Sequence, residues 1–321
     1  MRRMAPRILL LLCAVACGVC TAAVRYPERP IRMIQPFAPG GGVEAQARVV
    51  GQALASALGQ PVVIDSRPGA GGALGTQIAA QATPDGHTLL FTNSAFAIAP
   101  IFSAKPLFDP QRDFAPVIQI GTQPQILVAH PSLPPTLPEL LQAARQQPGK
   151  LSFGSPGTGT MSQLTMELLK SMARVDLLHV PYKGSAPAVT ALLSGEVQLA
   201  IFSANVVMPH VRAGRLRALG VTSLKRVASL PEVPAIAAAG LPAYETTQWS
   251  GMFAPARTPR PIVLKLNAAL SLLLQTDEVR QRLSGMGLEV TGGSPEQLAA
   301  YVREETARWS TLINEAGLRA R

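Results

Sequence analysis

Cysteine is nearly absent from this 321-residue sequence, and the three that occur lie within the first twenty residues. The rest of the chain therefore has no disulfide, no thiol nucleophile and no thiolate metal ligand. Aromatic residues are also scarce, at 5% of the sequence. A nucleic-acid-binding surface would need a basic stripe with interleaved stacking rings, and none is present, so we expect no nucleic-acid partner.

Long hydrophobic runs are missing as well, since no stretch reaches the roughly 18 apolar residues of a membrane-spanning helix. The apolar stretch at 8–20 is shorter, and it lies between three arginines and a small-residue end. This order is typical of a signal peptide, so we expect residues 1–23 to be removed and the mature protein to be exported to the periplasm. Lipidation of Cys17 is an alternative, although Ala14 stands where a lipoprotein signal has leucine.

Basic residues outnumber acidic ones, with 29 Lys and Arg against 19 Asp and Glu. Removal of the three arginines of the signal peptide leaves 26 basic residues and a net charge of +7. Because the arginines are scattered along the chain, the simplest interpretation is a solvated basic surface that attracts anions mildly.

Short apolar runs alternate with amphipathic stretches from residue 31 onward. The pattern predicts strands at 31–37, 61–64, 87–92, 151–154, 177–180, 197–202 and 216–222, with helices between them. This βαβαβ order predicts parallel, doubly wound sheets. A chain of this length is too long for one small core, so we expect two α/β domains with a cleft between them.

Three segments carry more specific signals. Thr136 with Glu139 three residues later, and Ser294 with Gln297, are capping-box arrangements that predict helix starts. The Pro-rich stretch at 230–244 predicts a packed connection rather than a sheet element.

Two glycine-rich loops each follow a predicted strand and precede a predicted helix. PFAPGGG at 36–42 and SPGTGT at 155–160 would each place a helix N-terminus at the carboxyl end of a parallel strand. The first loop lacks the Lys-Ser/Thr of a P-loop and the spacing of a dinucleotide fold, which argues against a nucleotide. A tight turn is the alternative interpretation. Hydroxyls in the second loop favour an anion site, because carboxylates accept from hydroxyls and amides.

A third glycine cluster, RPGAGGALG at 67–75, could be another anion loop. We interpret it instead as a turn that lets a helix pack closely.

No catalytic constellation emerges. The four histidines, His87, His130, His179 and His210, are far apart in sequence, and none has a second histidine at helical metal-ligand spacing. Ser155 does not lie in a G-x-S-x-G elbow, and no nearby His and Asp suggest a triad. His179 is interpreted as the end of a strand. We therefore expect no enzyme, no metal and no cofactor.

A set of ordered segments across nearly the whole mature chain resembles the extracytoplasmic solute-binding proteins of tripartite tricarboxylate transporters, the Bug family. The segments are YPERPIRMIQPFAPGGG, DSRPGAGGALG, TPDGHTLL, DFAPVIQIG, PGKLSFGSPGTGT, HVPYKGSAPAV, GRLRALGVTS, LPEVPAIAAAGLPAYE and APARTP. The resemblance implies the type II periplasmic-binding-protein fold, in which two α/β domains close on a small carboxylate. It further implies membrane transporter subunits as partners, and we expect a monomer.

The resemblance also implies how the chain divides. Domain 1 would comprise residues 24–123 and 247–321, and domain 2 would comprise 124–246, with crossings near 120–125 and 244–250. The family's ligand loops match 36–42 and 155–160, the two loops selected above on physical grounds.

The candidate ligand-binding residues come from these loops and from positions that the topology brings to the cleft. They are Phe37, Pro39, Gly40, Gly41, Gly42, Glu44, Thr92, Asn93, Ser94, Ser155, Thr158, Gly159, Thr160, Tyr182 and Ser203.

The sequence departs from the family pattern at three places. Val43-Glu44 replaces a usual Thr-Asp, Thr158 replaces a usual Asn, and no acidic residue occurs between Val197 and His210. If those acids receive an amino group, this protein should prefer plain carboxylates to amino acids. A clear preference for glutamate or aspartate would contradict that hypothesis.

Two alternatives stay open at the level of sequence. An exported metabolite sensor could contact a two-component signalling system, and neighbouring genes would distinguish it from a transport receptor. An exported hydrolase is compatible with the same fold class, but the sequence shows no nucleophile and base that would act together.

Overall fold

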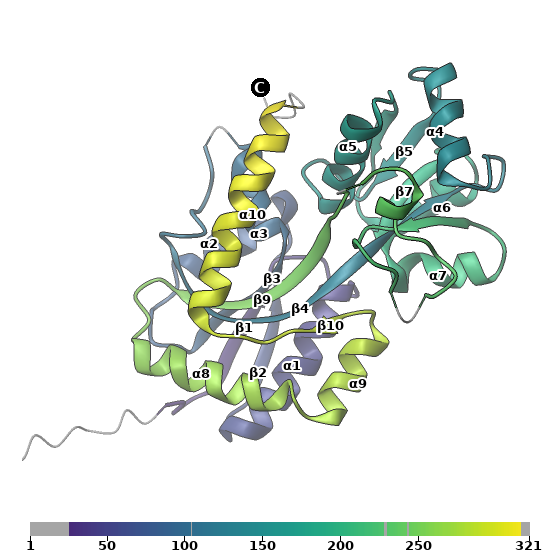
Figure 1. Cartoon of the computed structure of the whole chain (residues 1–321). Coiled ribbons are helices and arrows are strands. Elements are labelled where there is room, and N and C mark those ends of the chain that lie inside the picture. The colour runs from purple at the N-terminus through teal and green to yellow at the C-terminus, as the bar shows by residue number, and fades with distance from the viewer. Residues whose placement is uncertain (1–25, 104, 228–229, 243, 316–321) are drawn as a thin grey trace, which may run out of the picture.

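The structure is a computed structural model that describes residues 26–103, 105–227, 230–242 and 244–315. The predicted signal peptide, including Cys17, lies outside the described residues. Two α/β lobes lie side by side, and two long strands, β4 (Phe114–Ala129) and β9 (Thr247–Pro255), run between them (Figure 1).

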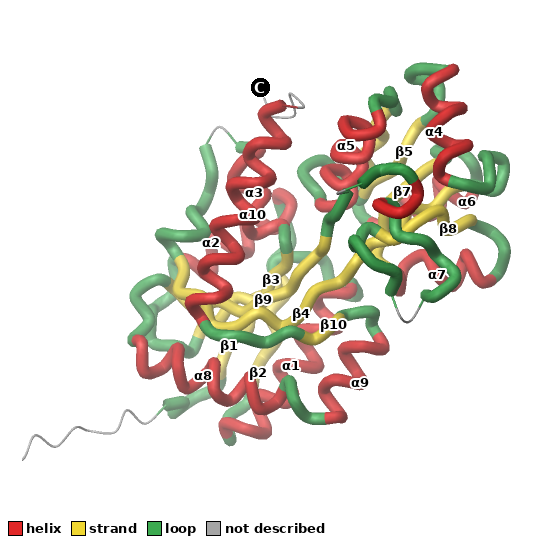
Figure 2. The backbone as a smooth tube through the Cα atoms, in the orientation of Figure 1, coloured by secondary structure: helices red, strands yellow, loops and turns green. Residues whose placement is uncertain are grey.

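The chain alternates strands and helices over most of its length (Figure 2). The other strands are β1 (Ile31–Gln35), β2 (Val62–Ser66), β3 (Thr88–Asn93), β5 (Ser152–Ser155), β6 (Leu178–Pro181), β7 (Leu199–Ser203), β8 (Arg217–Val221) and β10 (Glu289–Val290). The α-helices are α1 (Gly42–Leu58), α2 (Ala73–Ala80), α3 (Ala95–Phe102), α4 (Leu137–Gln146), α5 (Met161–Ala173), α6 (Ser185–Leu193), α7 (Ala204–Arg212), α8 (Arg260–Leu273), α9 (Asp277–Gly285) and α10 (Pro295–Glu315). Two short 3-10 turns are η1 (Ala70–Gly72) and η2 (Ala237–Ala239).

The strand order is β2-β1-β3-β9-β4-β7-β5-β6, with β8 and β10 also paired to β4. Strands β1, β2 and β3 are mutually parallel, as are β5, β6 and β7, whereas β4 and β9 run antiparallel to their neighbours. The predicted parallel units are therefore confirmed. The α/β fold class is confirmed as well.

Strand β4 passes from one lobe to the other. Residues 114–124 pair with β9, and residues 125–129 pair with β7. We call the part with β1, β2, β3, β9 and β10 the first lobe, and the part with β5, β6, β7 and β8 the second lobe. The exact domain boundaries expected from the sequence remain a prediction.

Apolar periodicity did not predict β4 as a strand. It carries Pro116 and Pro124, and its pairing with β9 shifts register near Pro116 and between Gln119 and Gly121. Proline cannot donate to the ladder and is tolerated in strands at edges and bulges.

Helices cover both faces of the first lobe's sheet. Helices α1, α8 and α9 pack on one face, where Ile31, Met33 and Phe91 point. Helices α2, α3 and α10 pack on the other face, where Ile34 and Leu90 point. This division follows from strand geometry, since successive side chains point to opposite faces.

The second lobe repeats the arrangement. Helices α4 and α5 pack on one face of its sheet, and helices α6 and α7 pack on the other. The Pro-rich stretch is a packed connection, as predicted: Leu230, Ile236 and Tyr244 are buried in these cores, and only Ala235 forms a β-bridge, with Val221.

Both predicted capping boxes are present. Thr136 Oγ1 accepts the N–H of Glu139 at the start of α4. Ser294 Oγ accepts the N–H of Gln297, whose side chain in turn accepts the N–H of Ser294 before α10. These bonds satisfy N–H groups that a helix start leaves without intrahelical partners.

Candidate functional site

The first glycine loop joins β1 to α1. Gly40 has φ +81°, a conformation that favours glycine, and Gly41 caps the helix without a side-chain hydrogen bond. Residues 38–42 are exposed. The N–H groups of the first helical turn have no intrahelical acceptor, so this loop exposes donors at the carboxyl end of β1.

Glu44 occupies one of these donors. Its buried carboxylate accepts the N–H of Gly40 and is paired with Arg48 one turn further along α1. The hydrogen bond from Gly40, followed by that from Arg48, holds the pKa of Glu44 below its usual range. The Gly40 N–H is thus engaged within the protein, whereas the N–H groups of Gly41 and Gly42 donate no hydrogen bond found among the described residues.

Phe37 and Gln35 shape the base of this loop. Gln35 is fully buried. Its side-chain oxygen accepts the N–H of Phe37, and its side-chain nitrogen donates to the carbonyl of the same residue. The Phe37 ring packs against the third glycine cluster, where a Cβ on Gly72 would lie 3.0 Å from ring atom Cε1. This contact supports the close-packing interpretation of residues 67–75. Nothing in the periodicity singled out Gln35, because a glutamine inside a strand is an unspecific signal.

The second loop, residues 155–160, is held by its own hydrogen bonds. Ser155 Oγ accepts the N–H of Gly157 at 3.2 Å and lies 3.0 Å from the carbonyl oxygen of Gly157. Thr160 Oγ1 donates to the same carbonyl at 2.8 Å. The N–H of Gly159 is bound by Gln163 Oε1. Thr158 is exposed at the tip of the loop.

Each loop faces the opposite lobe. A Cβ on Gly42 would lie 3.5 Å from Asn205 Nδ2 at the start of α7 in the second lobe. A Cβ on Gly159 would lie 3.4 Å from the Phe102 ring of α3 in the first lobe. Two candidate residues that the sequence reasoning missed, Asn205 and Phe102, therefore lie between the lobes. Asn205 went unnoticed because an asparagine near a helix start usually serves as a cap or a surface residue.

Thr92, Asn93 and Ser94 lie where β3 pairs with β9. Thr92 and Ser94 are fully buried, and Ser94 Oγ accepts the backbone N–H of Trp249 at 2.9 Å. Asn93 Oδ1 accepts the N–H of Ala95 at the start of α3. The Ser94 hydroxyl therefore anchors the end of β3 to β9, the strand that runs between the lobes, whereas Thr92 Oγ1 has no hydrogen-bond partner among the described residues.

Tyr182 and Ser203 already have partners within the protein. The Tyr182 hydroxyl donates to Glu196 at 2.8 Å. Burial, with the neighbouring Glu196 carboxylate, raises the pKa of Tyr182 to about 12. Ser203 Oγ donates to Gln248 Oε1 at 3.4 Å, which links the start of α7 to β9.

Sequence analysis found no His and Asp near Ser155 that suggest a triad, but the fold does bring one histidine to this serine. His179 Nε2 lies 2.7 Å from Ser155 Oγ, because β5 and β6 pair in parallel with Phe153 opposite His179. His179 also lies within β6 rather than at its end. Spacing in the sequence could not show this, since the helix α5 separates the two strands.

The pair nevertheless lacks the surroundings of a nucleophile and its base. Ser155 is fully buried, and among the described residues no carboxylate hydrogen bonds to the imidazole. Burial, followed by the nearby Lys170 cation, lowers the pKa of His179 to about 4.

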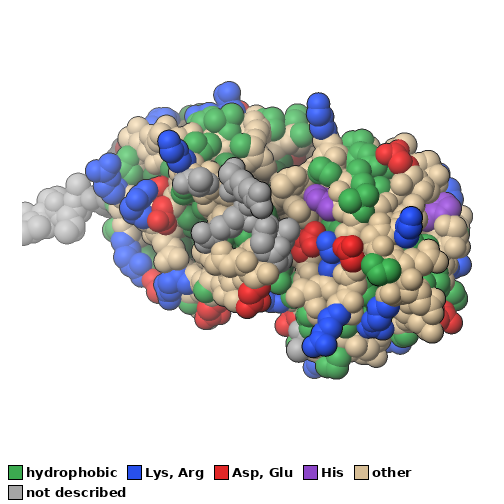
Figure 3. Space-filling model, turned by 90° about the horizontal axis from the view of Figure 1, so that it is seen from above, with side chains coloured by type: hydrophobic (Ala, Val, Ile, Leu, Met, Phe, Trp, Pro, Cys, Tyr) green, Lys and Arg blue, Asp and Glu red, His purple; other side chains and the backbone are tan. Residues whose placement is uncertain are grey.

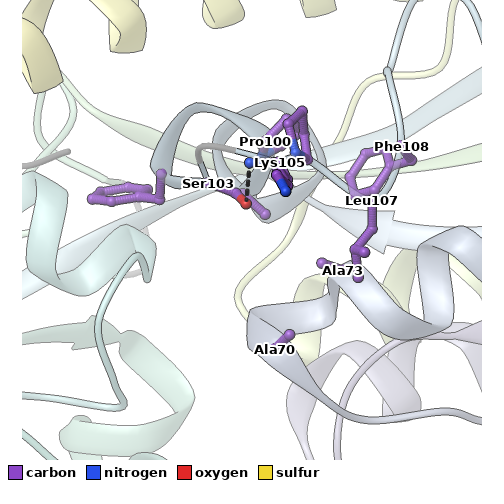
Figure 4. A pocket seen from close by; sticks show the side chains of 10 residues that line it. Ala70, Ala73, Pro100, Ser103, Lys105, Leu107 and Phe108 are labelled. Carbon is purple, nitrogen blue, oxygen red and sulfur yellow. Dashed lines mark hydrogen bonds between the residues drawn. The ribbon is translucent and has the colours of Figure 1, made fainter. Parts of the chain in front are cut away.

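Two cavities have volumes of about 360 Å³ each. The first, in Figure 4, is lined by Ala70, Ala73, Ala99, Pro100, Phe102, Ser103, Lys105, Pro106, Leu107 and Phe108. The second is lined by Glu245, Thr247, Tyr301, Glu304, Glu305 and Arg308. None of the fifteen candidate ligand residues lines either cavity. Phe102, which faces Gly159, lines the first and brings it close to the second loop.

Three further observations concern the charged surface, metal ligands and helix hydropathy of the described residues. Lys and Arg side chains are scattered over both lobes on the face shown in Figure 3, rather than gathered in one stripe. Within residues 26–315, apart from the four undescribed positions, no group of three His, Cys, Asp or Glu side chains could hold a metal ion. No described helix is long and apolar enough to cross a membrane.

Comparison with known proteins identifies the family. Residues 46–318 match the tripartite tricarboxylate transporter family receptor. The chain is 43% identical over 317 residues to a protein of the tcbD-tcbE intergenic region of a Pseudomonas species, covering 96% of this chain and 94% of that protein. It is 35% identical to BugT of Bordetella pertussis, covering 92% of each.

The chain belongs to the Bug family of tripartite tricarboxylate transporter receptors.

Several solved structures are similar to this chain over about nine tenths of its length. Rpa4515 of R. palustris, solved with adipate, has a TM-score of 0.85 and 36% identity, covering 91% of this chain and 98% of that one. MatC of Rhodopseudomonas palustris, solved with bound malate, has a TM-score of 0.81 and 35% identity, covering 90% and 100%. The periplasmic binding protein BugD has a TM-score of 0.82 and 34% identity, covering 92% and 100%. The type II periplasmic-binding-protein fold is thereby confirmed.

Proposed function

We propose that this Bug-family protein is a periplasmic receptor that captures a small organic anion between its lobes. The anion is a dicarboxylate, a tricarboxylate or a related carboxylate. The receptor then delivers it to the membrane subunits of a tripartite tricarboxylate transporter. It acts without chemical turnover of the ligand, without a cofactor and as a monomer.

One observation carries the proposal: the exposed N-terminus of α1 faces the N-terminus of α7 across the gap between the lobes. Gly42 and Asn205 approach within 3.5 Å, as measured from a Cβ built on Gly42. Helix N-termini present unpaired N–H groups and a partial positive charge, which together favour a carboxylate. The amides of Gly41 and Gly42 would bind one end of the ligand.

The second loop would bind the other end. Thr158 is exposed, and the N–H groups of the first turn of α5 lack intrahelical acceptors. Phe37, Pro39 and Tyr182 would shape the walls, and ordered waters could bridge the remaining distance. Ser94 and Glu44 would support the site, since their polar atoms already have partners within the protein.

Two ligand-bound relatives support the ligand class. Rpa4515 was solved with adipate and MatC with malate, both dicarboxylates, at 36% and 35% identity to this chain. The periplasmic relative BugD supports the location. We therefore use adipate and malate as probes.

The test is thermal unfolding of residues 24–321 with adipate, malate, citrate, glutamate and neutral analogues. A ligand that binds only the folded state stabilises it by about 2.7 kcal/mol at a hundredfold excess over its Kd. We expect an upward shift of the unfolding midpoint with plain carboxylates and a smaller one with glutamate.

Variants at Gly42 locate the site. Gly42→Ala adds only a methyl group at ordinary contact distance, so the ligand-induced shift should persist. Gly42→Phe would fill the space in front of Asn205, and the shift should disappear. A shift that survives Gly42→Phe, or a shift with neutral compounds alone, would show that the anion site has been misplaced.

A further inference from the structure

His179 forms a hydrogen bond with Ser155, the residue that begins the second glycine loop. Its Nε2 atom lies 2.7 Å from Ser155 Oγ, and its ring stacks on Phe153 at 4.8 Å between centroids. Ser155 is fully buried. This contact therefore lies directly behind the loop rather than in the space where a ligand would enter.

Ser155 is the link between His179 and the loop. Its Oγ atom lies within hydrogen-bond distance of both the N–H and the carbonyl of Gly157, at 3.2 and 3.0 Å. The carbonyl of Gly157 also accepts from Thr160 Oγ1, the residue that caps α5. The position of one serine hydroxyl thus determines where Gly157 and the start of α5 lie.

The position of the imidazole proton decides which group donates in each hydrogen bond of Ser155 Oγ. A serine hydroxyl has one proton and two lone pairs. If the imidazole carries its proton on Nε2, it donates to Ser155 Oγ, and Ser155 donates its own proton to the carbonyl of Gly157. Ser155 Oγ still accepts the N–H of Gly157, so the Ser155 hydroxyl and both the N–H and the carbonyl of Gly157 have partners. With the proton on Nδ1 instead, Ser155 would donate to His179, and the carbonyl of Gly157 would keep only the hydrogen bond from Thr160 Oγ1.

We infer that His179 is a positioning residue for the second ligand loop: its Nε2–H orients the Ser155 hydroxyl, which fixes Gly157 and the N-terminus of α5. This inference rests on the proposed function, because it assigns a role in holding the same anion site ready for its ligand.

The surroundings keep the imidazole neutral. Burial is the main cause of its lowered pKa, and the Lys170 cation of α5 is the second. Lys170 lies 5.7 Å from the centroid of the Phe153 ring and is paired with Glu167 at 2.9 Å. A neutral imidazole carries one ring proton, so its hydrogen bond with Ser155 decides which nitrogen holds it.

Two substitutions of His179 distinguish the contribution of its N–H donor from that of its aromatic ring. His179→Gln keeps an N–H group near the position of Nε2 but loses the aromatic ring. His179→Phe keeps the ring that stacks on Phe153 but has no donor. If His179 acts through its N–H, His179→Gln preserves function and His179→Phe does not. If it acts only by filling space, the order is reversed and the inference is wrong.

The first readout needs no ligand. Exchange of the Gly157 amide hydrogen reports whether the N–H is held by Ser155. We expect exchange to accelerate about tenfold in His179→Phe, comparable to the loss of one buried hydrogen bond, and to change by less than about twofold in His179→Gln. Unchanged exchange in His179→Phe would overturn the inference.

The second readout is affinity for adipate and malate by calorimetry. His179→Phe should raise Kd about tenfold, and His179→Gln should stay within about threefold of the natural protein. Ser155→Ala should match His179→Phe, and the double variant should be no weaker than either single variant, because both remove the same link. Additive losses would contradict that link.

Ser152→Ala is the matched control, since Ser152 is a buried serine of the same strand whose hydroxyl bonds to Gln198 instead of the loop. It should leave both the Gly157 exchange and the affinity unchanged.

The two hypotheses fail in different ways. If the natural protein binds neither probe, the proposed function fails, while the exchange of Gly157 still tests the role of His179. If the natural protein binds and His179→Phe binds equally well, the positioning role fails and the proposed function stands.

Discussion

At the scale of single residues, Glu44 shows how the glycine loop at 36–42 is held by groups of the protein itself. Its carboxylate binds the N–H of Gly40 and the guanidinium of Arg48, and it is buried at the start of α1. An acidic group in the first turn is favoured by the helix dipole. The same electrostatics that stabilise Glu44 would stabilise an incoming carboxylate beside it.

Glu44→Gln should lower the stability of the protein at neutral pH but not at low pH. The pKa of Glu44 in the folded state is below its ordinary value of 4.5. Its contribution to stability is therefore present above pH 4.5 and is lost as pH falls through the folded-state pKa. Urea unfolding at pH 7 and pH 3 measures this.

The matched control is Glu232→Gln, because Glu232 is exposed and takes part in no hydrogen bond or ion pair found in the described part of the chain. Its unfolding should match that of the natural protein at both pH values. A Glu44→Gln variant as stable as the natural protein at pH 7 would mean that solvent replaces the carboxylate at no cost.

At the scale of elements, the third glycine cluster brings α2 against the end of β1. Glycines at 69, 71 and 72 have positive φ, so the chain turns sharply before the helix. A Cβ on Gly75 would overlap the carbonyl oxygen of Arg67 and lie 2.9 Å from Pro36 Cα. The cluster thus lets α2 pack closely against the end of β1, and this packing sets the position of the glycine loop at 36–42.

Gly75→Ala should destabilise the first lobe by about 1–3 kcal/mol, because backbone atoms of residues 36 and 67 must move to admit the methyl group. Gly285→Ala is the control, since nothing lies within 4 Å of a Cβ at that helical position. It should be neutral or stabilising by up to about 1 kcal/mol. Equal stability of the two variants in urea unfolding would refute the packing role.

At the scale of the whole molecule, an apolar cluster spans the two lobes. It contains Ile98, Ile101 and Phe102 from α3, Met161, Leu164 and Leu168 from α5, and Trp309, Leu312 and Ile313 from α10. The lobes therefore touch through side chains as well as through β4 and β9. Such a contact favours the closed arrangement, and a ligand between the lobes would favour it further.

Phe102→Ala should shift the equilibrium between open and closed lobes. The ring lies 3.4 Å from a Cβ built on Gly159 in the other lobe, and its loss removes that contact. We expect a larger radius of gyration without ligand in small-angle scattering and a Kd for adipate raised about fivefold.

Leu272→Ala is the control for Phe102→Ala, because Leu272 on α8 is 70% exposed and lies outside the cluster. Scattering and affinity should both match the natural protein. An unchanged radius of gyration in Phe102→Ala would show that the apolar cluster does not hold the lobes together.

Sequence reasoning predicted the parallel strands and both capping boxes, since these features depend on neighbours close in the chain, whereas the assignment of residues 36–42 and 155–160 to ligand binding stays a prediction. Apolar periodicity missed β4 as a strand, because its prolines and register shifts break the alternation on which strand prediction depends, although the family resemblance placed a crossing near residues 120–125, within β4. It also missed Asn205, Phe102 and Gln35, whose partners lie on other elements.

The sequence by itself determined the α/β class, the alternation of strands and helices, and the family, because periodicity, turn residues and ordered motifs depend only on residues that are close together in the chain. Only the tertiary structure decided which groups meet. Parallel pairing of β5 and β6 places His179 against Ser155, and the approach of the lobes brings Gly42 to Asn205. These contacts depend on strand register and lobe packing, which act between residues far apart in the sequence.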